Sequence, residues 1–261
     1  MSVDVYVVDA FSDRPFGGNP AGVVLLPSFR DPEWMQAVAA ELQHSETAFV
    51  EVSGPSDAPK PLRWFTPTTE VDLCGHATLA TAHVLGGDQV FTTRSGELSC
   101  TATEDGRIEM DFPADRTTPL AEPPAELSAI LGGARIVAAA TGEADLLVEV
   151  ESPAVVDGIR PDLAALAALA YRGLLVTASG GPDGIDFVSR CFFPRVGIAE
   201  DPVTGSAHCT LATWWADKLG RDELVGEQRS ARGGTVRVAL RGDRVVLSGR
   251  ATTVLRGNLY S

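Results

Sequence analysis

The chain has 261 residues, enough for one large domain or for two of about 120 to 130 residues, and either size can bury a sizeable core. Hydrophobic residues make up 44% and charged residues 21%, which is ordinary for a globular protein, and no apolar run reaches the roughly 18 residues of a membrane-spanning helix. The formal net charge of −14 argues against nucleic acid and anionic membranes as partners, because both would require a basic face.

Cysteine usage and the N-terminal residues narrow the class further. The four cysteines show no Cys-x-x-Cys spacing, so they fit neither a disulfide scaffold nor a structural zinc site; they are Cys74, Cys100, Cys191 and Cys209. The chain begins without a basic region ahead of an apolar core. We therefore expect a cytoplasmic protein with reduced thiols.

The first half of the chain is predicted to alternate strands with two helices. Asp31-Pro32 supplies a cap and a first-turn proline ahead of apolar positions at helical spacing, and this helix should end near Gln43-His44. Glu46 then lies between this helix and the next strand. Gly86-Gly87 should end the second helix. The predicted strands are residues 3–8, 21–26, 48–52, 62–65, 90–93, 97–102 and 108–112.

A proline-rich stretch, residues 113–124, predicts the boundary between two halves. We place the N-terminal half at 1–116, with the last strand, 252–261, as a candidate addition, and the C-terminal half at 117–251. From residue 117 onward, the chain should contain helices at 125–131, 162–171 and 210–216, and strands at 136–140, 146–150, 174–178, 187–193, 235–240, 245–248 and 252–255. Strands joined by short turns favour antiparallel or mixed sheets.

One motif, an acidic turn that opens into an alanine-rich helix, occurs twice. Its two glycines, Gly75 and Gly205, are 130 residues apart, which is half of the chain. The repeat extends upstream, because an Arg-x-Phe-x-Pro pattern at Arg63 recurs in similar form at Arg190. Two such units facing each other would form a pseudo-twofold molecule with a cleft between them.

The two helix starts can bind an anion. Backbone N–H groups at Gly75-His76 and Gly205-Ser206 would point to the positive end of a helix dipole, which suits a carboxylate or phosphate. The structural alternative is that the glycines only allow the turn and that Asp72 or Ser206 only caps the helix.

Three side chains are candidates for proton transfer. His76 has an ordinary pKa near neutrality and can act as acid, base or donor, although a histidine at a helix start is more often structural. Glu46, if desolvated, could shuttle a proton, although an isolated acid is more often a solvated surface residue. Asp201 can orient a partner or simply begin the turn before Pro202.

Other catalytic patterns are missing from the sequence. It contains no dinucleotide or Walker motif, no Gly-x-Ser-x-Gly elbow, and no histidines at metal-ligand spacing with an acidic partner. We expect neither a metal nor a cofactor, and the remaining chemistry is proton movement.

Five stretches resemble the PhzF-like proteins of phenazine biosynthesis, which share the diaminopimelate epimerase fold. They run nearly end to end and cover residues 8–11 with 15–21, 45–49, 63–67 with 70–78, 200–207 and 228–234. The resemblance implies an α+β fold of two pseudo-symmetric halves. Each half would be a mixed, mostly antiparallel sheet curled around a central helix, with the site between the halves and a homodimer as the assembly.

The resemblance also implies a cofactor-independent isomerase. Glu46 would move a proton within a small carboxylate-bearing metabolite similar to dihydro-hydroxyanthranilate, with His76 and Asp201 assisting. The substrate-binding candidates are Asn19, Ser45, Asp72, Cys74, Gly75, Thr204, Gly205 and Ser206.

Two alternatives remain open. The epimerases of this fold use two cysteines; Cys74 matches one of them, but Thr204 occupies the position of the other, which argues against a two-thiol racemase. An amino-acid epimerase using Glu46 with Cys74 or His76 stays possible, as does a small-anion binding protein without catalysis.

Overall fold

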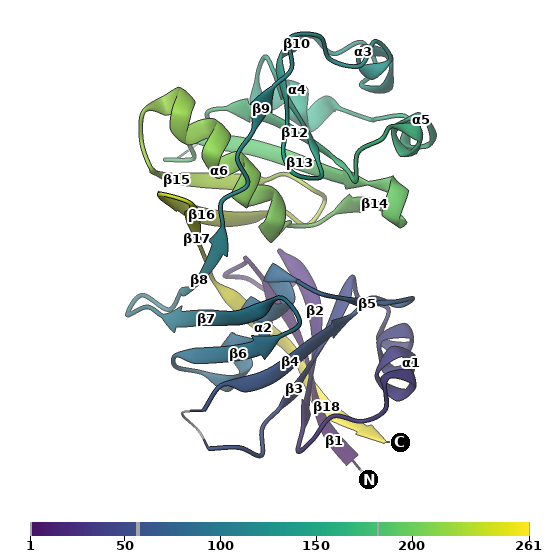
Figure 1. The fold of residues 1–261 in the computed structure, drawn as a ribbon, viewed down its shortest axis with the longest axis vertical. Coiled ribbons are helices and arrows are strands. Elements are labelled where there is room, and N and C mark those ends of the chain that lie inside the picture. The colour runs from purple at the N-terminus through teal and green to yellow at the C-terminus, as the bar shows by residue number, and fades with distance from the viewer. Residues whose placement is uncertain (1, 56–57, 182, 261) are drawn as a thin grey trace. The chain divides into compact units, whose positions relative to one another are not determined.

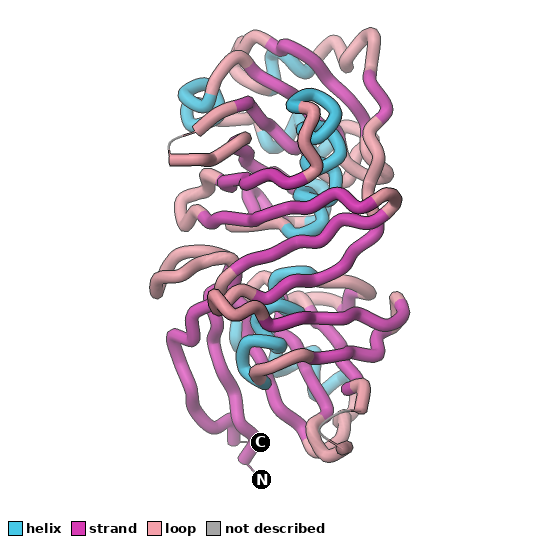
Figure 2. Tube along the Cα trace, turned by 90° about the vertical axis from the view of Figure 1, so that its left-hand side faces the viewer, coloured by secondary structure: helices cyan, strands magenta, loops and turns pink. Residues whose placement is uncertain are grey.

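Strands dominate the chain, and they fall into two units, Met1–Phe112 with Ser248–Ser261, and Pro113–Leu247 (Figures 1 and 2). This computed structural model describes residues 2–55, 58–181 and 183–260. No helix within those ranges is long and apolar enough to span a membrane.

The first unit contains one mixed sheet and two helices. Its elements are β1 (Ser2–Ala10), β2 (Asn19–Leu26), α1 (Pro32–Leu42), β3 (Glu46–Glu51), β4 (Lys60–Phe65), β5 (Glu70–Val71), α2 (Gly75–Leu85), β6 (Gln89–Thr93), β7 (Gly96–Ala102), β8 (Ile108–Pro113) and β18 (Ala251–Tyr260). Strand β1 pairs antiparallel with both β2 and β18, so the first and last strands of the chain are neighbours. Pairs β2–β3 and β4–β6 are parallel, and pairs β3–β4, β6–β7 and β7–β8 are antiparallel.

The second unit repeats this plan. Its elements are β9 (Thr118–Pro119), α3 (Leu127–Ile130), β10 (Ile136–Thr141), β11 (Leu146–Val150), α4 (Pro153–Gly158), α5 (Leu163–Ala168), β12 (Leu174–Ser179), β13 (Phe187–Phe193), the 3-10 helix η1 (Pro194–Val196), β14 (Ile198–Asp201), α6 (Gly205–Leu219), β15 (Glu223–Gln228), β16 (Gly234–Arg241) and β17 (Arg244–Gly249). Pairs β11–β12 and β13–β15 are parallel, whereas β10–β11, β12–β13 and β15–β16 are antiparallel.

The two units therefore share one strand order. In each, the parallel steps occur where a helix connects the strands: α1 and α2 in the first unit, and α4–α5 and α6 in the second. Short β9 pairs with β10 as β18 pairs with β1. The prediction of an α+β fold with two similar halves and mixed, mostly antiparallel sheets is confirmed.

One helix in each unit is buried on nearly every side. Every residue from 76 to 82 of α2 is buried, and so is every residue from 207 to 216 of α6. Helix α2 packs against β1, β2, β3 and β18, and α6 packs against β15 and β16. A helix that is apolar around its whole circumference belongs inside a protein, so each sheet is built around its helix.

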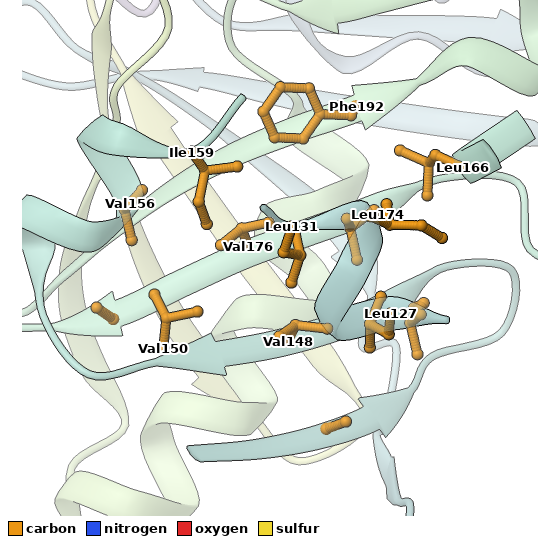
Figure 3. Close-up of a cluster of buried hydrophobic side chains, with 14 of the residues drawn as sticks. Leu127, Leu131, Val148, Val150, Val156, Ile159, Leu166, Leu174, Val176 and Phe192 are labelled. Carbon is orange, nitrogen blue, oxygen red and sulfur yellow. The ribbon is translucent and has the colours of Figure 1, made fainter. Parts of the chain in front are cut away.

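Each unit has its own apolar core. In the first, Phe49 of β3 makes edge contacts with Trp34 and Phe65. In the second, the shorter helices cover the face of β11, β12 and β13 (Figure 3). The side chains that meet there include Leu127, Val148, Val156, Leu166, Val176 and Phe192.

Some predicted elements differ from the observed ones. The helix expected at 125–131 is a single turn, Leu127–Ile130, and the helix expected at 162–171 ends at Ala168, because the next residue, Leu169, is extended. Helix α4 and strands β14 and β15 were not predicted. They are only six, four and six residues long, too short for a clear hydrophobic period.

Candidate active site

Glu46 is the first residue of β3 and follows a tight reversal of the chain. Helix α1 ends at Leu42, and Gln43 takes a left-handed conformation with φ 56° that turns the backbone towards the sheet. The parallel pairing of Ala21 with Glu46 fixes where the strand begins. The carboxylate of Glu46 is 15% exposed, so it keeps some access to solvent.

His76, the second residue of α2, lies against this carboxylate. Its Nε2 is 3.3 Å from Glu46 Oε2, and its Nδ1 is 3.3 Å from the amide nitrogen of Asn19 and 3.5 Å from Cys74 Sγ. Because the Asn19 amide nitrogen can only donate, Nδ1 is the acceptor, and the proton of the neutral ring is on Nε2. The protonated nitrogen of His76 therefore faces Glu46.

Burial keeps this imidazole neutral. The His76 residue is 5% exposed, and desolvation, with a smaller effect of His44, lowers the pKa of His76 to about 3. A neutral histidine beside a carboxylate adds no charge of its own.

The side chains of Glu46, Cys74 and His76 are chemically able to hold a metal ion. One ligand atom each from Glu46, Cys74 and His76 lies within 4.8 Å of the others. Sequence spacing did not reveal this set, because Glu46 comes from a strand far from Cys74 and His76 in the chain. The amide of Asn19 already donates to Nδ1 of His76, on the side where Cys74 lies.

Cys74, not Asp72, is the N-cap of α2, and its side chain makes no capping hydrogen bond. The side chain of Asp72 is 74% exposed, with Arg94 at 3.8 Å. Ser45 is half-buried and directly precedes Glu46. The first unit thus brings Asn19, Cys74 and His76 together with Glu46, whereas Asp72 points to solvent.

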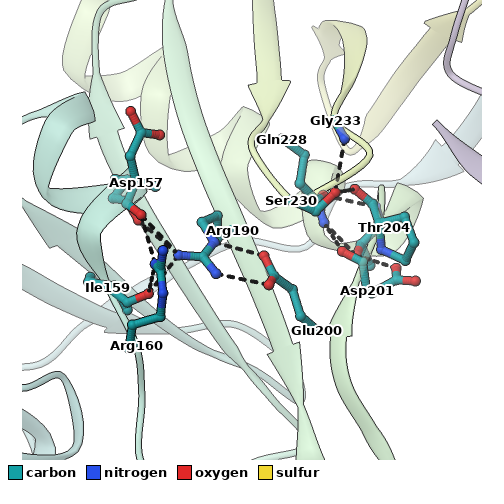
Figure 4. A network of polar contacts seen from close by, with 12 residues as sticks. Asp157, Ile159, Arg160, Arg190, Glu200, Asp201, Thr204, Gln228, Ser230 and Gly233 are labelled. Atoms are coloured by element: carbon teal, nitrogen blue, oxygen red, sulfur yellow. Dashed lines mark hydrogen bonds and ion pairs between the residues drawn. The ribbon is translucent and has the colours of Figure 1, made fainter. Parts of the chain in front are cut away.

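A buried hydrogen-bond network holds the corresponding turn of the second unit (Figure 4). Thr204 Oγ1 donates to the carboxylate of Asp201. Gln228 accepts from the Thr204 backbone N–H at 2.9 Å and donates to the Asp201 carbonyl at 2.7 Å. Ser230 Oγ donates to the Pro202 carbonyl at 2.8 Å. The turn between β14 and α6 is therefore fixed from both sides.

Thr204 is the N-cap of α6 and, like Cys74, makes no capping hydrogen bond with its side chain. Gly205 is buried and begins the helix, and Ser206 is exposed. His208 is fully buried and its Nδ1 lies 2.8 Å from the Thr204 carbonyl, which as an acceptor requires a proton on Nδ1. Neither Asp72 nor Ser206 is the cap of its helix.

Each turn motif is preceded by the same ion pair. Arg63 donates to Glu70 through Nε and Nη2 at 2.7 Å each, and Arg190 donates to Glu200 at 2.7 and 2.8 Å. These forked bonds join adjacent strands, β4 to β5 and β13 to β14. Arg190 also donates from Nη1 to the Ile159 carbonyl at 2.7 Å (Figure 4).

Gln228 and Arg172 were not among the residues to which sequence reasoning gave a role. In β15, Leu224, Gly226 and Gln228 alternate with more exposed residues, but this burial pattern is visible only in the structure, because the six residues show no clear period in the sequence. Arg172 offered no signal in the sequence either, because its contact with Ser206 joins residues that are far apart in the chain.

The chain was compared with known proteins. The family profile described as phenazine biosynthesis-like protein matches residues 8–257. An uncharacterized isomerase of Pseudomonas aeruginosa is 48% identical, with 100% of both chains covered, and one of Halalkalibacterium halodurans is 45% identical, with 99% of both covered.

Similar solved structures indicate the same family. A PhzF family protein of Enterococcus faecalis superimposes with a TM-score of 0.92 at 41% identity over 100% of both chains. A hydroxyproline epimerase of Agrobacterium vitis, at 12% identity, has a TM-score of 0.60 over 99% of this chain and 92% of its own, which relates the fold to epimerases and no more. On these matches, the chain belongs to the phenazine biosynthesis-like, or PhzF-like, family and is an isomerase.

Proposed function

We propose that the protein is a cofactor-independent isomerase that moves a proton within a small carboxylate-bearing metabolite, with Glu46 as the acid and base. One observation carries the proposal: the partly exposed Glu46 carboxylate lies 3.3 Å from the Nε2 of a buried histidine. The pKa of His76 is lowered to about 3, so its ring stays neutral near neutral pH, and we assign the proton transfer to Glu46.

Glu46 and His76 have different roles in the proposed reaction. As a carboxylate, Glu46 removes a proton from one carbon of the substrate and, as a carboxylic acid, returns it to another. The neutral ring of His76 lies 3.3 Å from this carboxylate and carries no net charge that would hold Glu46 permanently ionised. Asn19 keeps the ring in this tautomer through its bond to Nδ1.

Other residues are proposed to bind the substrate. Gly75 and Gly205 begin helices whose cap side chains leave the first-turn N–H groups unbonded by the cap, and such groups suit a carboxylate. Asp201 assists through its bond from Thr204. Ser45 and Ser206 are included as hydroxyl donors. Asp72 is the weakest candidate because its side chain is 74% exposed.

The proposed substrate is a cyclic or unsaturated carboxylate similar to the dihydro-hydroxyanthranilate of phenazine biosynthesis. Family membership supports this class. Amino-acid epimerisation is less well supported. Such a reaction needs an acid on each face of the α-carbon, and the repeat position of Cys74 is occupied by Thr204, which is no acid.

Hydrogen exchange tests the proposal. The protein is incubated in D₂O with a panel of cyclic and unsaturated carboxylates, and deuterium uptake and isomer formation are followed by mass spectrometry. We expect Glu46→Gln to lower turnover by a factor of about 10²–10⁴, the usual contribution of general acid–base catalysis, since the amide cannot exchange a proton. The matched control, Glu41→Gln on the exposed face of α1, should retain full activity. Full turnover by Glu46→Gln would refute the assignment.

We further propose that the protein is a cytoplasmic homodimer. The net charge of −14 supports a molecule without nucleic-acid or membrane partners. Light scattering coupled to size exclusion should give twice the chain mass of 27.4 kDa, and a monomer at micromolar concentration would contradict the dimer.

A further inference from the structure

Arg172 lies directly beside a proposed substrate-binding residue, Ser206, and carries a positive charge. Its Nη2 donates to Ser206 Oγ at 3.3 Å. Its Nε donates to Asp145 Oδ1 at 2.9 Å, and Nη2 also bonds the second oxygen of that carboxylate. The guanidinium additionally packs over the ring of Phe193, with 5.3 Å from Cζ to the ring centre. Arg172 is therefore held in one orientation by three separate groups.

The guanidinium of Arg172 is accessible to solvent, whereas the Asp145 carboxylate that binds it is buried. The side chain of Asp145 is 2% exposed, whereas that of Arg172 is 41% exposed. Within the described residues Nη1 makes no hydrogen bond, so two N–H donors remain for a ligand. The hydrogen bond to Asp145 raises the pKa of Arg172, which is a cation at every working pH.

The repeat places Arg172 at the counterpart of the catalytic strand start. In the first unit Thr47 pairs with Phe65, and in the second Leu174 pairs with Phe192, two residues after Arg63 and Arg190 respectively. Counting back from Thr47 and Leu174, Gly173 corresponds to Glu46 and Arg172 corresponds to Ser45. Ser206 corresponds to His76, because both follow the motif glycine. The pair Glu46–His76 thus corresponds to Gly173 and Ser206, and Arg172, one residue before Gly173, is the side chain that reaches Ser206.

Gly173 shows that the second unit cannot carry a side chain at the Glu46 position. A Cβ there would lie 2.1 Å from Phe193 Cδ1 and 2.8 Å from the Phe192 carbonyl oxygen, and both contacts are prohibitively short. The equivalent location is closed to a second acid or base. The residue next to it, Arg172, donates a hydrogen bond to Ser206.

We infer that Arg172, together with Ser206, binds the substrate's carboxylate and makes the enzyme select anionic over neutral substrates. The inference rests on the proposed function, which supplies a carboxylate-bearing substrate. Arginine suits this task because its planar fork matches a carboxylate, and the charge-assisted bond is stronger than a neutral one. In a chain with a net charge of −14, such a local cation offsets the general repulsion of anions.

Binding of 2-aminobenzoate and its neutral analogue, 2-aminobenzamide, tests the inference by calorimetry. We expect the wild-type protein to bind the carboxylate at least tenfold more tightly than the amide. Arg172→Gln should remove this preference by weakening only carboxylate binding, and Arg172→Lys should restore part of it. The control is Arg135→Gln, which removes an exposed arginine of the same unit and should leave both affinities unchanged. A wild-type protein without the preference, or an Arg172→Gln variant that keeps it, would overturn the inference.

Two further variants separate binding from folding and from catalysis. Because Arg172→Gln leaves Asp145 buried without its cation, the double variant Arg172→Gln with Asp145→Asn removes both charges, and it too should lose the preference for the carboxylate. Glu46→Gln, which retains Arg172, should still bind 2-aminobenzoate more tightly than 2-aminobenzamide. If Glu46 proves unnecessary for turnover, the proposed function fails while the contribution of Arg172 to carboxylate binding is still measured.

Discussion

His76 and His208 are histidines that the fold keeps uncharged, and each belongs to the first turn or two of a buried helix. Burial lowers the pKa of His76 to about 3 and that of His208 to about 4. In the first unit the neutral ring faces Glu46, and in the second it bonds the Thr204 carbonyl. The uncharged state is therefore a property of both halves of the repeat.

These depressed pKa values predict a loss of stability in mild acid. In the unfolded chain both histidines take up protons below about pH 6.5, whereas in the folded protein they stay unprotonated down to about pH 4. Lowering the pH from 6.5 to 5 should therefore reduce the free energy of unfolding by about 3 kcal/mol for the two groups together. Urea titrations at several pH values measure this dependence.

The single variants His76→Gln and His208→Gln serve as the controls for this pH dependence. Each should remove about half of the slope between pH 6.5 and 5, whatever its effect on stability at pH 7. A wild-type protein whose stability is flat over this interval would contradict the assignment of neutral histidines.

At the scale of secondary-structure elements, two forked ion pairs join the strands that precede α2 and α6. They are Arg63–Glu70 and Arg190–Glu200, and their surroundings differ. Glu70 has a second partner, Arg94, at 2.7 Å. Glu200 pairs with Arg190, which also binds the Ile159 carbonyl just after α4. Loss of Arg190 would thus leave the Glu200 carboxylate without its donor, whereas the Ile159 carbonyl would keep its hydrogen bond from Arg160.

We expect Arg190→Met to destabilise the protein by about 3 kcal/mol, because its pair is largely buried and removing one partner leaves the other uncompensated. Arg63→Met should cost about 1 to 2 kcal/mol, since Arg94 continues to neutralise Glu70. Urea unfolding of both variants gives the comparison. Arg135→Met is the surface reference, with a cost of about 1 kcal/mol or less. Equal losses at positions 63 and 190 would contradict this account.

Much of the element pattern could be predicted, and the errors have a common physical cause. Helix α1 is confirmed within two residues of its expected end, because a proline start and a clear apolar period marked it. Helix α4 was missed, although Ser152 caps it and Pro153 begins it, because six residues show too little periodicity. The contacts of Gln228 depend on tertiary pairing of β13 with β15, which no local pattern specifies.

For the whole molecule, the 130-residue repeat was the most informative feature of the sequence, since it predicted two similar units from spacing alone. The same repeat concealed a chemical difference. Strand starts at equivalent positions carry Glu46 in one unit and Gly173 beside Arg172 in the other. Which positions are equivalent follows only from strand register, so the asymmetry became visible only in the structure.

Truncation tests the role of the last strand in the fold of the first unit. Strand β18 pairs with β1 along nine residues, and its removal would expose that edge and one side of α2. A chain ending at Arg250 should therefore lose cooperative unfolding of the first unit, as measured by circular dichroism during urea titration. Adding a peptide of residues 248–261 should restore it. A truncated chain that unfolds like the full-length protein would contradict the prediction.

The pairing of β1 with β18 also has a consequence for biosynthesis. A nascent chain leaves the ribosome from its N-terminus, so β1 emerges long before β18 and lacks this partner until residues 251–260 have been made. The unit of residues 113–247 is continuous in sequence, so it can fold before β18 is made. Most of the first unit is synthesised before it but has to wait for β18. During this interval β1 offers an unpaired edge, and a cell that makes this protein has to protect that edge from other chains until β18 has been made.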